Sequence, residues 1–135
     1  MKMERFESAD VWRRARELNR MIYAVSDTSR LSRDAELRGK LRNAALEMME
    51  RLAEAFEGGD GADRRKSLSR ARAACGRIRS QCYVARDQQY ISAVDFQDLS
   101  RRARDVSDRA AFWLGRLPPE RGRLFGFVRP ARAAA

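Results

Sequence analysis

Apolar side chains recur at alternating steps of three and four residues along most of the chain, which is the spacing of one buried face of an α-helix. In the segment from about residue 8 to residue 26, this stripe consists of Val11, Ala15, Leu18, Ile22 and Val25. The segment from about 35 to 57 follows the same schedule with Leu37, Leu41, Ala44, Met48 and Ala55, widened by Ala45, Leu52 and Phe56. Both segments are therefore predicted to be amphipathic helices.

Two further segments carry the most regular spacing. The segment from about 62 to 87 has its apolar residues at Leu68, Ala71, Cys75, Ile78, Cys82 and Ala85. The segment from about 93 to 117 continues with Phe96, Leu99, Ala103, Val106, Ala110, Trp113 and Leu117. Ser92, three residues before Asp95, resembles a capping box and predicts the start of the last helix, which Pro118-Pro119 ends.

Heptad spacing favours helices that cross at about 20°, the geometry of a four-helix bundle. The connections are short, so sequential helices are expected to be antiparallel neighbours. The sequence thus predicts an all-α chain, an antiparallel up-down four-helix bundle within residues 1–117, and no second domain. Residues 118–135 form a basic, aromatic tail, either disordered or a docking arm that buries Phe125 and Phe127 on a partner.

The loop Gly58-Gly59-Asp60-Gly61 separates the second and third predicted helices. Glycine readily adopts the positive φ of a helix C-terminus, so a plain turn is expected. Phosphate-binding glycine loops also contain such clusters. This loop follows a helix, however, and has neither the GxGxxG spacing nor the GK[ST] ending of those loops.

Composition adds a strong positive charge, because 29 basic and 19 acidic residues give a net charge of +10. Only Lys2, Lys40 and Lys66 of the basic residues are lysine. Arginine contacts phosphate with two parallel hydrogen bonds and stacks on bases, so this bias suits nucleic acid. A GC-rich genome would also favour arginine over lysine, which explains the ratio of the two residues but not the net charge.

The charge concentrates on the segment 62–87, which holds eight basic and two acidic residues. Arg65, Arg72, Arg79 and Arg86 repeat every seven residues and so form one row over roughly 30 Å of helix. Arg70 and Arg77 repeat that spacing on what we expect to be a neighbouring row. These six arginines are predicted to bind the phosphates of RNA or DNA.

Internal pairing is the alternative for these arginines. Glu47 and Glu54 also lie seven residues apart and could pair with them across a groove between two helices. In the last segment, Asp98 and Asp105 each precede an arginine by four residues, a spacing at which charges neutralise each other along a helix. Two glutamates cannot neutralise six arginines, so a positive surface is expected in either case.

Catalytic and metal chemistry lack suitable residues. The chain has no histidine, so a common general base and metal ligand is missing, and we expect no enzymatic activity, metal or cofactor. Cys75 and Cys82 lie about 10 Å apart on a helix, too far for a disulfide, and are expected to be buried reduced thiols. The opening MKMERFESAD lacks the apolar run of a signal peptide, and no later window would span a membrane, so a cytoplasmic location is expected.

Three stretches together resemble a known family: FESADVWRRARELN, ELRGKLRNAALEMMERLAEAFEGGD and YVARDQQYISAVDFQDLSRRARDVSDRAAFWLGRL. They are similar to the four-helix bundle superfamily of the intervening-sequence proteins found in some bacterial large-subunit rRNA genes. That superfamily also contains the accessory variability determinant, Avd, of diversity-generating retroelements. The opening Asp10-Val11-Trp12 is similar to the intervening-sequence branch. The stretch ALEMMERLAEAF lacks the proline common in that branch and, with ARDQQYIS, looks more like Avd.

The resemblance implies a homopentameric barrel of bundles with a positively charged surface. For Avd, it implies association with a reverse transcriptase and its template RNA, without catalytic activity. The features carried over are the basic third helix as the nucleic-acid face and Trp12, Phe56 and Trp113 as packing or subunit-contact positions.

Two hypotheses follow for the function. The leading one is an oligomeric, non-enzymatic nucleic-acid-binding accessory protein, an Avd-like partner of a reverse transcriptase. The alternative is an oligomeric protein-interaction scaffold of the intervening-sequence type, whose arginines are mostly paired internally.

Overall fold

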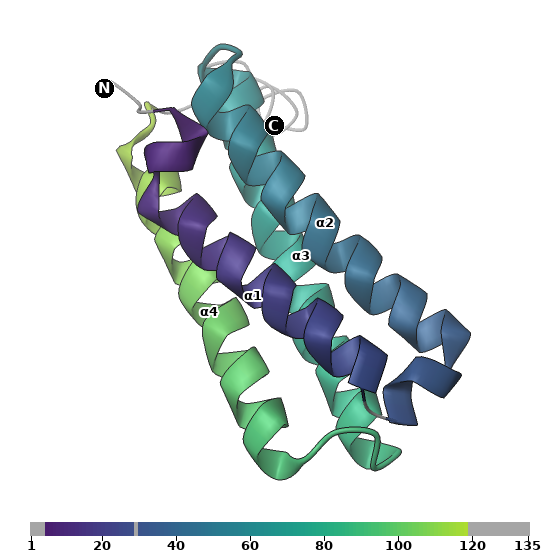
Figure 1. The fold of residues 1–135 in the computed structure, drawn as a ribbon. Helices are drawn as coiled ribbons and strands as arrows, with labels where there is room; N and C mark the ends of the chain where they lie inside the picture. Colours follow the sequence, from purple (N-terminus) through teal and green to yellow (C-terminus); the bar gives the residue numbers. More distant parts are fainter. Residues whose placement is uncertain (1–4, 29, 119–135) are drawn as a thin grey trace, which may run out of the picture.

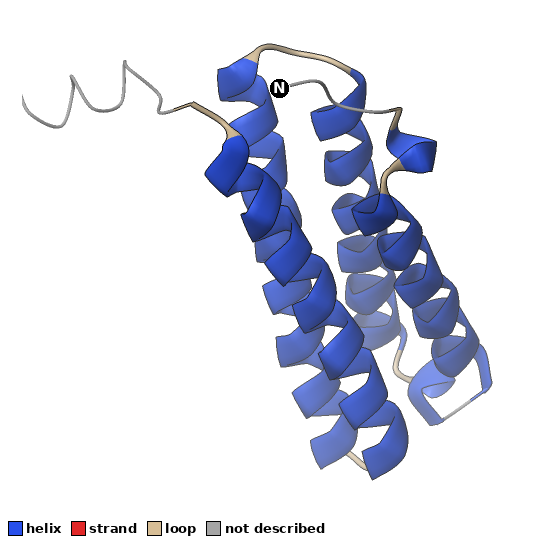
Figure 2. Cartoon of the chain, turned by 90° about the vertical axis from the view of Figure 1, so that its left-hand side faces the viewer, coloured by secondary structure: helices blue, strands red, loops and turns tan. Residues whose placement is uncertain are grey.

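A computed structural model describes residues 5–28 and 30–118. Its α-helices are α1 (Asp10–Thr28), α2 (Ala35–Glu57), α3 (Gly61–Asp87) and α4 (Ala93–Arg116). Two short 3₁₀ helices, η1 (Phe6–Ser8) and η2 (Arg30–Arg33), precede α1 and α2. Figure 2 shows helices and loops and no strand in this part of the chain. The prediction of an all-α, four-helix chain is confirmed, whereas the tail beyond Pro118 lies outside the described residues.

The four helices form an up-down bundle in which each is antiparallel to the next (Figure 1). Helix α1 packs against α2 and α4, and α3 packs against the same two helices, so α1 and α3 are diagonal partners. The start of α1, the α2–α3 turn and the end of α4 lie at one end of the bundle. The connections from α1 to α2 and from α3 to α4 lie at the other end.

Side-chain caps fix three of the helix starts. Asp34, Asp60 and Ser92 each accept a hydrogen bond from the backbone N–H three residues later, at 3.0 Å. Such caps satisfy amide donors that the first helical turn leaves without partners. The predicted cap at Ser92 is confirmed, and the cap at Asp60 starts α3 one residue earlier than expected.

The turn between α2 and α3 needs one glycine with positive φ. Gly58 is extended, whereas Gly59 has a φ of +80°. A Cβ atom at Gly59 would lie 2.8 Å from the Cβ of Asp63, so a larger residue there would meet both backbone strain and a clash.

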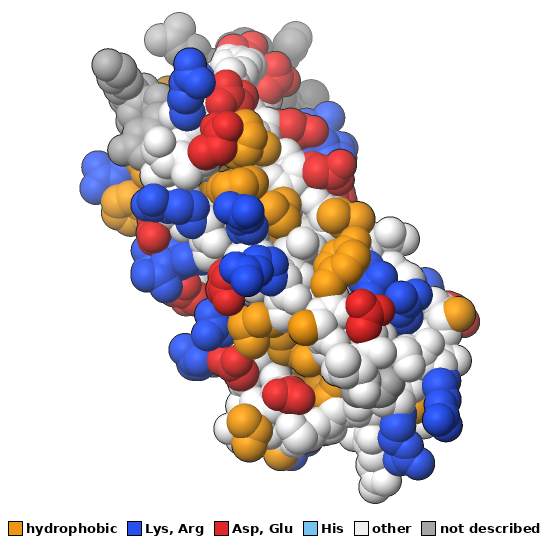
Figure 3. All heavy atoms as spheres, in the orientation of Figure 1, with side chains coloured by type: hydrophobic (Ala, Val, Ile, Leu, Met, Phe, Trp, Pro, Cys, Tyr) orange, Lys and Arg blue, Asp and Glu red, His pale blue; other side chains and the backbone are white. Residues whose placement is uncertain are grey.

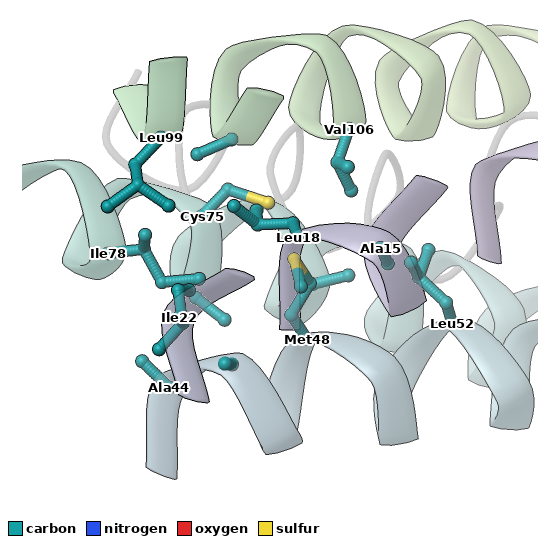
Figure 4. Packing of buried hydrophobic residues seen from close by; sticks show 14 of the residues in the cluster. Ala15, Leu18, Ile22, Ala44, Met48, Leu52, Cys75, Ile78, Leu99 and Val106 are labelled. Atoms are coloured by element: carbon teal, nitrogen blue, oxygen red, sulfur yellow. The ribbon is translucent and has the colours of Figure 1, made fainter. Parts of the chain in front are cut away.

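The core runs along the whole bundle axis and is built from the predicted apolar stripes. Figure 4 shows Leu18 of α1 near Met48 of α2 and Cys75 of α3, and Ile22 of α1 near Ile78 of α3. All five side chains are buried. Helix α3 contributes many small core residues, namely Ala71, Ala74, Cys75, Cys82 and Ala85. Small side chains allow close approach of the neighbouring helices, and α3 packs more extensively against α2 and α4 than α1 does.

Polar contacts close the end of the bundle where α1 passes to α2. Ser26 is fully buried, and its hydroxyl accepts a hydrogen bond from Arg42 Nε at 2.8 Å. The Arg42 guanidinium also lies 4.2 Å from the Tyr23 ring centroid and pairs with Asp27 at 2.6 Å. Hydrogen bonds from Arg38 and Arg42 lower the pKa of Asp27. Leu31 of η2, fully buried, completes this end of the core.

Both cysteines are buried and free, as expected. Burial raises the pKa of the Cys75 thiol, and likewise that of Cys82, to about 12. The two side chains therefore act as small apolar core residues.

No helix in the described ranges is long and apolar enough to cross a membrane.

We expect Leu18→Ala to lower the free energy of unfolding by about 2–5 kcal/mol, because it leaves a cavity at a fully buried position. The matched control is Leu46→Ala on α2, where the side chain is 40% exposed and the loss should stay below about 1 kcal/mol. Urea unfolding at one fixed protein concentration measures both. Equal losses would contradict the placement of Leu18 in the core.

We expect both thiols of the folded protein to react with a disulfide reagent at pH 8 far more slowly than in denaturant. The thiolate is the reactive form, and a pKa near 12 leaves about one thiol in ten thousand ionised at this pH. Single alanine variants at Cys75 and Cys82 assign the two rates. A thiol that reacts equally fast in both states would contradict its burial.

Candidate nucleic-acid interface

The four arginines of the heptad row lie along the seam between α3 and α4. Arg65 donates to the backbone carbonyl oxygens of Leu117, at 3.2 Å, and Pro118. Arg72 Nε donates to the hydroxyl of Ser107 at 3.3 Å. Arg65 and Arg72 lie about two turns apart on α3, and their partners run in the opposite direction along the chain, as expected for antiparallel neighbours.

Neither of the other two members of the row forms a hydrogen bond to α4 in the described part of the chain; Arg86 meets an aromatic ring of that helix instead. The Arg86 guanidinium lies 4.8 Å from the centroid of the Phe96 ring. Arg79 is half-buried, and its Nε atom is buried without a hydrogen-bond partner among the described residues. The hydroxyl of Ser100, on α4, is likewise buried without one. We call the four arginines of the row the seam arginines: Arg65, Arg72, Arg79 and Arg86. No carboxylate within residues 5–28 and 30–118 forms an ion pair with any of them.

Arg70 and Arg77 lie on the other flank of α3, toward α2. Arg77 forms an ion pair with Glu47 of α2. Arg70 lines a cleft of about 500 Å³ together with Glu54 and Glu57 of α2. The expectation that these two arginines adjoin the seam row is therefore wrong. Positions 72 and 77 are five residues apart, which at 100° per residue separates them by about 140° around the helix.

The glutamates of α2 are engaged away from the seam. Glu47 contacts Arg51 at 3.5 Å in addition to Arg77, and Glu54 contacts Arg51 at 3.1 Å. Glu54 also accepts a hydrogen bond from Ser67 at 3.3 Å. Internal pairing thus accounts for Arg77 but for none of the seam arginines.

Asp105 of α4 is engaged on the other side of that helix, toward α1. Asp10, Arg14, Asp105 and Arg109 form a closed ring of four ion pairs, with N–O distances of 2.7–3.2 Å. The hydrogen bond from Arg14 is the largest of the effects that lower the pKa of Asp10. Asp98 pairs with Arg102 at 3.1 Å, so both predicted pairs within α4 are confirmed. Figure 3 shows the resulting mixture of positive and negative side chains on the face that includes α1.

The exposed outer face of α3, between its two arginine flanks, carries only small side chains over three turns. These are Ser69, Ala73, Gly76 and Ser80, and all four are exposed. No atom lies within 4 Å of the position that a Cβ would take at Gly76. A ligand backbone can therefore approach α3 closely between arginines on either side.

The three predicted packing aromatics lie near one end of the bundle. Phe56 is buried and meets Trp113 edge to face, with 5.2 Å between the ring centroids. Trp12 meets Phe6 in the same way at 5.0 Å. Trp12 and Trp113 are partly buried against the core, and Phe112, beside Trp113, is 54% exposed. A role in subunit contacts stays a prediction.

No cluster of three or more potential metal ligands occurs within the described ranges. The arrangement offers cationic hydrogen-bond donors and aromatic rings, which are groups that bind anions and bases.

The chain matches the model of a known protein family. A family model described as 23S rRNA-intervening sequence protein matches residues 7–110, more than half of the chain. The matched range covers α1, α2 and α3 and most of α4. No curated protein sequence matches the chain. The chain therefore belongs to the 23S rRNA-intervening sequence protein family.

Proposed function

We propose that this chain is a non-enzymatic accessory protein that binds the phosphates of RNA or DNA through the seam arginines of α3. The observation that carries the proposal is the absence of a carboxylate partner for all four within the described residues. The acids of α2 and α4 form their ion pairs elsewhere, so this charge is left for an external partner. A polyanion fits a row of like charges over roughly 30 Å of helix.

Binding through phosphates depends little on the base sequence of the nucleic acid. Guanidinium groups contact phosphate oxygens, which carry no base identity, so these contacts position the nucleic acid without specifying it. Arg72 reaches a hydroxyl of α4, and Arg65 reaches only backbone carbonyl oxygens just after that helix. A phosphate would offer each guanidinium a charged acceptor in addition.

The more specific proposal is an Avd-like role beside a reverse transcriptase and its template RNA. The support is the uninterrupted α2 and the stretch ARDQQYIS before α4, both of which resemble the Avd branch. An rRNA-associated family is consistent with a nucleic-acid partner. A reverse-transcriptase gene next to this one, with a template and variable repeat pair, would support the role; co-purification of the two proteins would test it directly.

A protein-interaction scaffold is the second candidate. It is favoured by the ion pair between Arg77 and Glu47 and by the closed ring that includes Asp10 and Arg109, since these show that many arginines are neutralised within the chain. In that case the affinity for nucleic acid would be incidental.

The double substitution Arg72→Gln and Arg79→Gln tests the phosphate contacts. We expect weaker binding to unrelated RNA and DNA sequences alike, and a log–log slope of affinity against salt that is smaller by roughly two, one for each lost contact. Glutamine retains a long polar side chain and good helix propensity, so the fold should persist. Fluorescence anisotropy at several salt concentrations measures the binding, and a melting curve checks the fold.

The matched control removes the same charge from the diagonal helix, with Arg13→Gln and Arg20→Gln on α1. It should change affinity and salt slope much less, because long-range charge effects are screened beyond about 10 Å at 0.1 M salt. If the seam variant melts at a lower temperature and still binds normally, the scaffold hypothesis is favoured and the nucleic-acid proposal fails.

We also propose that the chain assembles into a homo-oligomer, and specifically the pentamer that the resemblance implies. Phe112, with Trp12 and Trp113 near the same end of the bundle, offers apolar surface suited to a contact between copies. Light scattering at micromolar concentration should give about five times the 15.5 kDa chain mass. A monodisperse 15.5 kDa species would rule the assembly out.

A further inference from the structure

An exposed tyrosine interrupts the seam arginines. Tyr83 follows Arg79 by four residues and precedes Arg86 by three, so it projects from the same flank of α3. Its side chain is 54% exposed. Phosphate binding by the arginines does not by itself explain why an aromatic residue lies between them.

The ring of Tyr83 contacts an aromatic side chain of α4 but remains partly exposed to solvent. It meets the Phe96 ring of α4 edge to face, with 4.8 Å between centroids and 66° between planes. Phe96 is itself only 6% exposed, and Arg86 lies over the same ring. Tyr83, Phe96 and Arg86 thus form a cluster, anchored in the core, that leaves about half of the tyrosine open to solvent.

We propose that α3 binds an unpaired stretch of nucleic acid, with Tyr83 stacking on one base while Arg79 and Arg86 contact the phosphates beside it. The inference rests on the proposed function and specifies its ligand class. Bases in a duplex are stacked on both faces, whereas bases in single strands, loops and ends are free to stack on an aromatic ring. An aromatic ring between phosphate-binding arginines is therefore suited to the unpaired form.

The outer face of α3 favours the same ligand. Ser80 and Gly76 continue the exposed surface from the level of Tyr83 along the helix, and neither carries a side chain large enough to keep a strand away. Arg72 lies farther along the seam. A flexible single strand can follow this surface from Tyr83 toward Arg72, with its phosphates near the arginines and its bases turned outward or onto the ring.

The test compares two ligands of equal length, a labelled single-stranded RNA without self-complementarity and its perfect duplex. Tyr83→Leu removes the ring and should weaken single-strand binding roughly tenfold, with less than about a twofold effect on the duplex. Tyr83→Phe keeps the ring and should retain the single-strand affinity. Leu46→Ala is the control, because it also truncates an exposed apolar side chain (40% exposed) but lies on α2, away from the seam arginines; it should change neither affinity.

The salt dependence gives a second measurement. Stacking releases no counterions, so Tyr83→Leu should leave the log–log salt slope unchanged, whereas Arg79→Gln should lower it by roughly one. An unfolded or misfolded variant would instead lose binding to both ligands and change the slope.

Three outcomes would overturn the proposal. Equal affinity of Tyr83→Leu and the unchanged protein for single strands would remove the stacking role, even if Arg72→Gln with Arg79→Gln still abolished binding and so upheld the proposed function. A loss of the same size for duplex and single strand would also overturn it. A changed molecular mass of Tyr83→Leu, with intact single-strand affinity, would assign the ring to a contact between copies of the chain.

Discussion

The close packing of α3 against α2 and α4 determines where the arginine side chains of α3 can reach the surface. Its core face is built mainly from alanine and cysteine, so the two neighbouring helices approach it closely and cover both sides of that face. A long cationic side chain next to such a face has to emerge through a seam between helices. The heptad repeat that buries Ala71, Ile78 and Ala85 therefore also carries the arginines along the two seams.

The acidic residues distribute unequally between these seams, and this inequality leaves one seam with the positive charge that we propose binds nucleic acid. Helix α2 presents Glu47 and Glu54 toward α3 and neutralises part of that flank. Helix α4 uses Asp105 in the ring with α1, where it is shared between two arginines. Its side facing α3 offers a hydroxyl, backbone carbonyls and an aromatic ring instead. Neutral partners hold guanidinium groups in place without cancelling their charge, which is the condition that an anion-binding surface requires.

Features that repeat along the chain were predictable from the sequence, whereas features that depend on the rotation of one helix against another were not. The four helices, the cap at Ser92 and the pairs within α4 follow from local spacing. The burial of Leu31 in η2 and the bond from Arg42 to Ser26 have no periodic signal, because they join segments at a bundle end. The two flanks of α3 could have been separated by counting 100° per residue, yet only the structure shows which flank meets the glutamates.

The family match and the arginine seam without carboxylate partners carry different information. A family match alone describes a helical scaffold, since the same core packing is compatible with many different surface side chains. The seam adds chemistry that packing does not require: a core needs apolar residues at Cys75 and Cys82, but it does not need arginine at positions 72 and 79 beside them. Uncharged polar residues there would avoid the repulsion within the row and the unsatisfied Nε of Arg79. The proposed ligand fits this row, because phosphate groups are partners that arginine recognises with both charge and geometry.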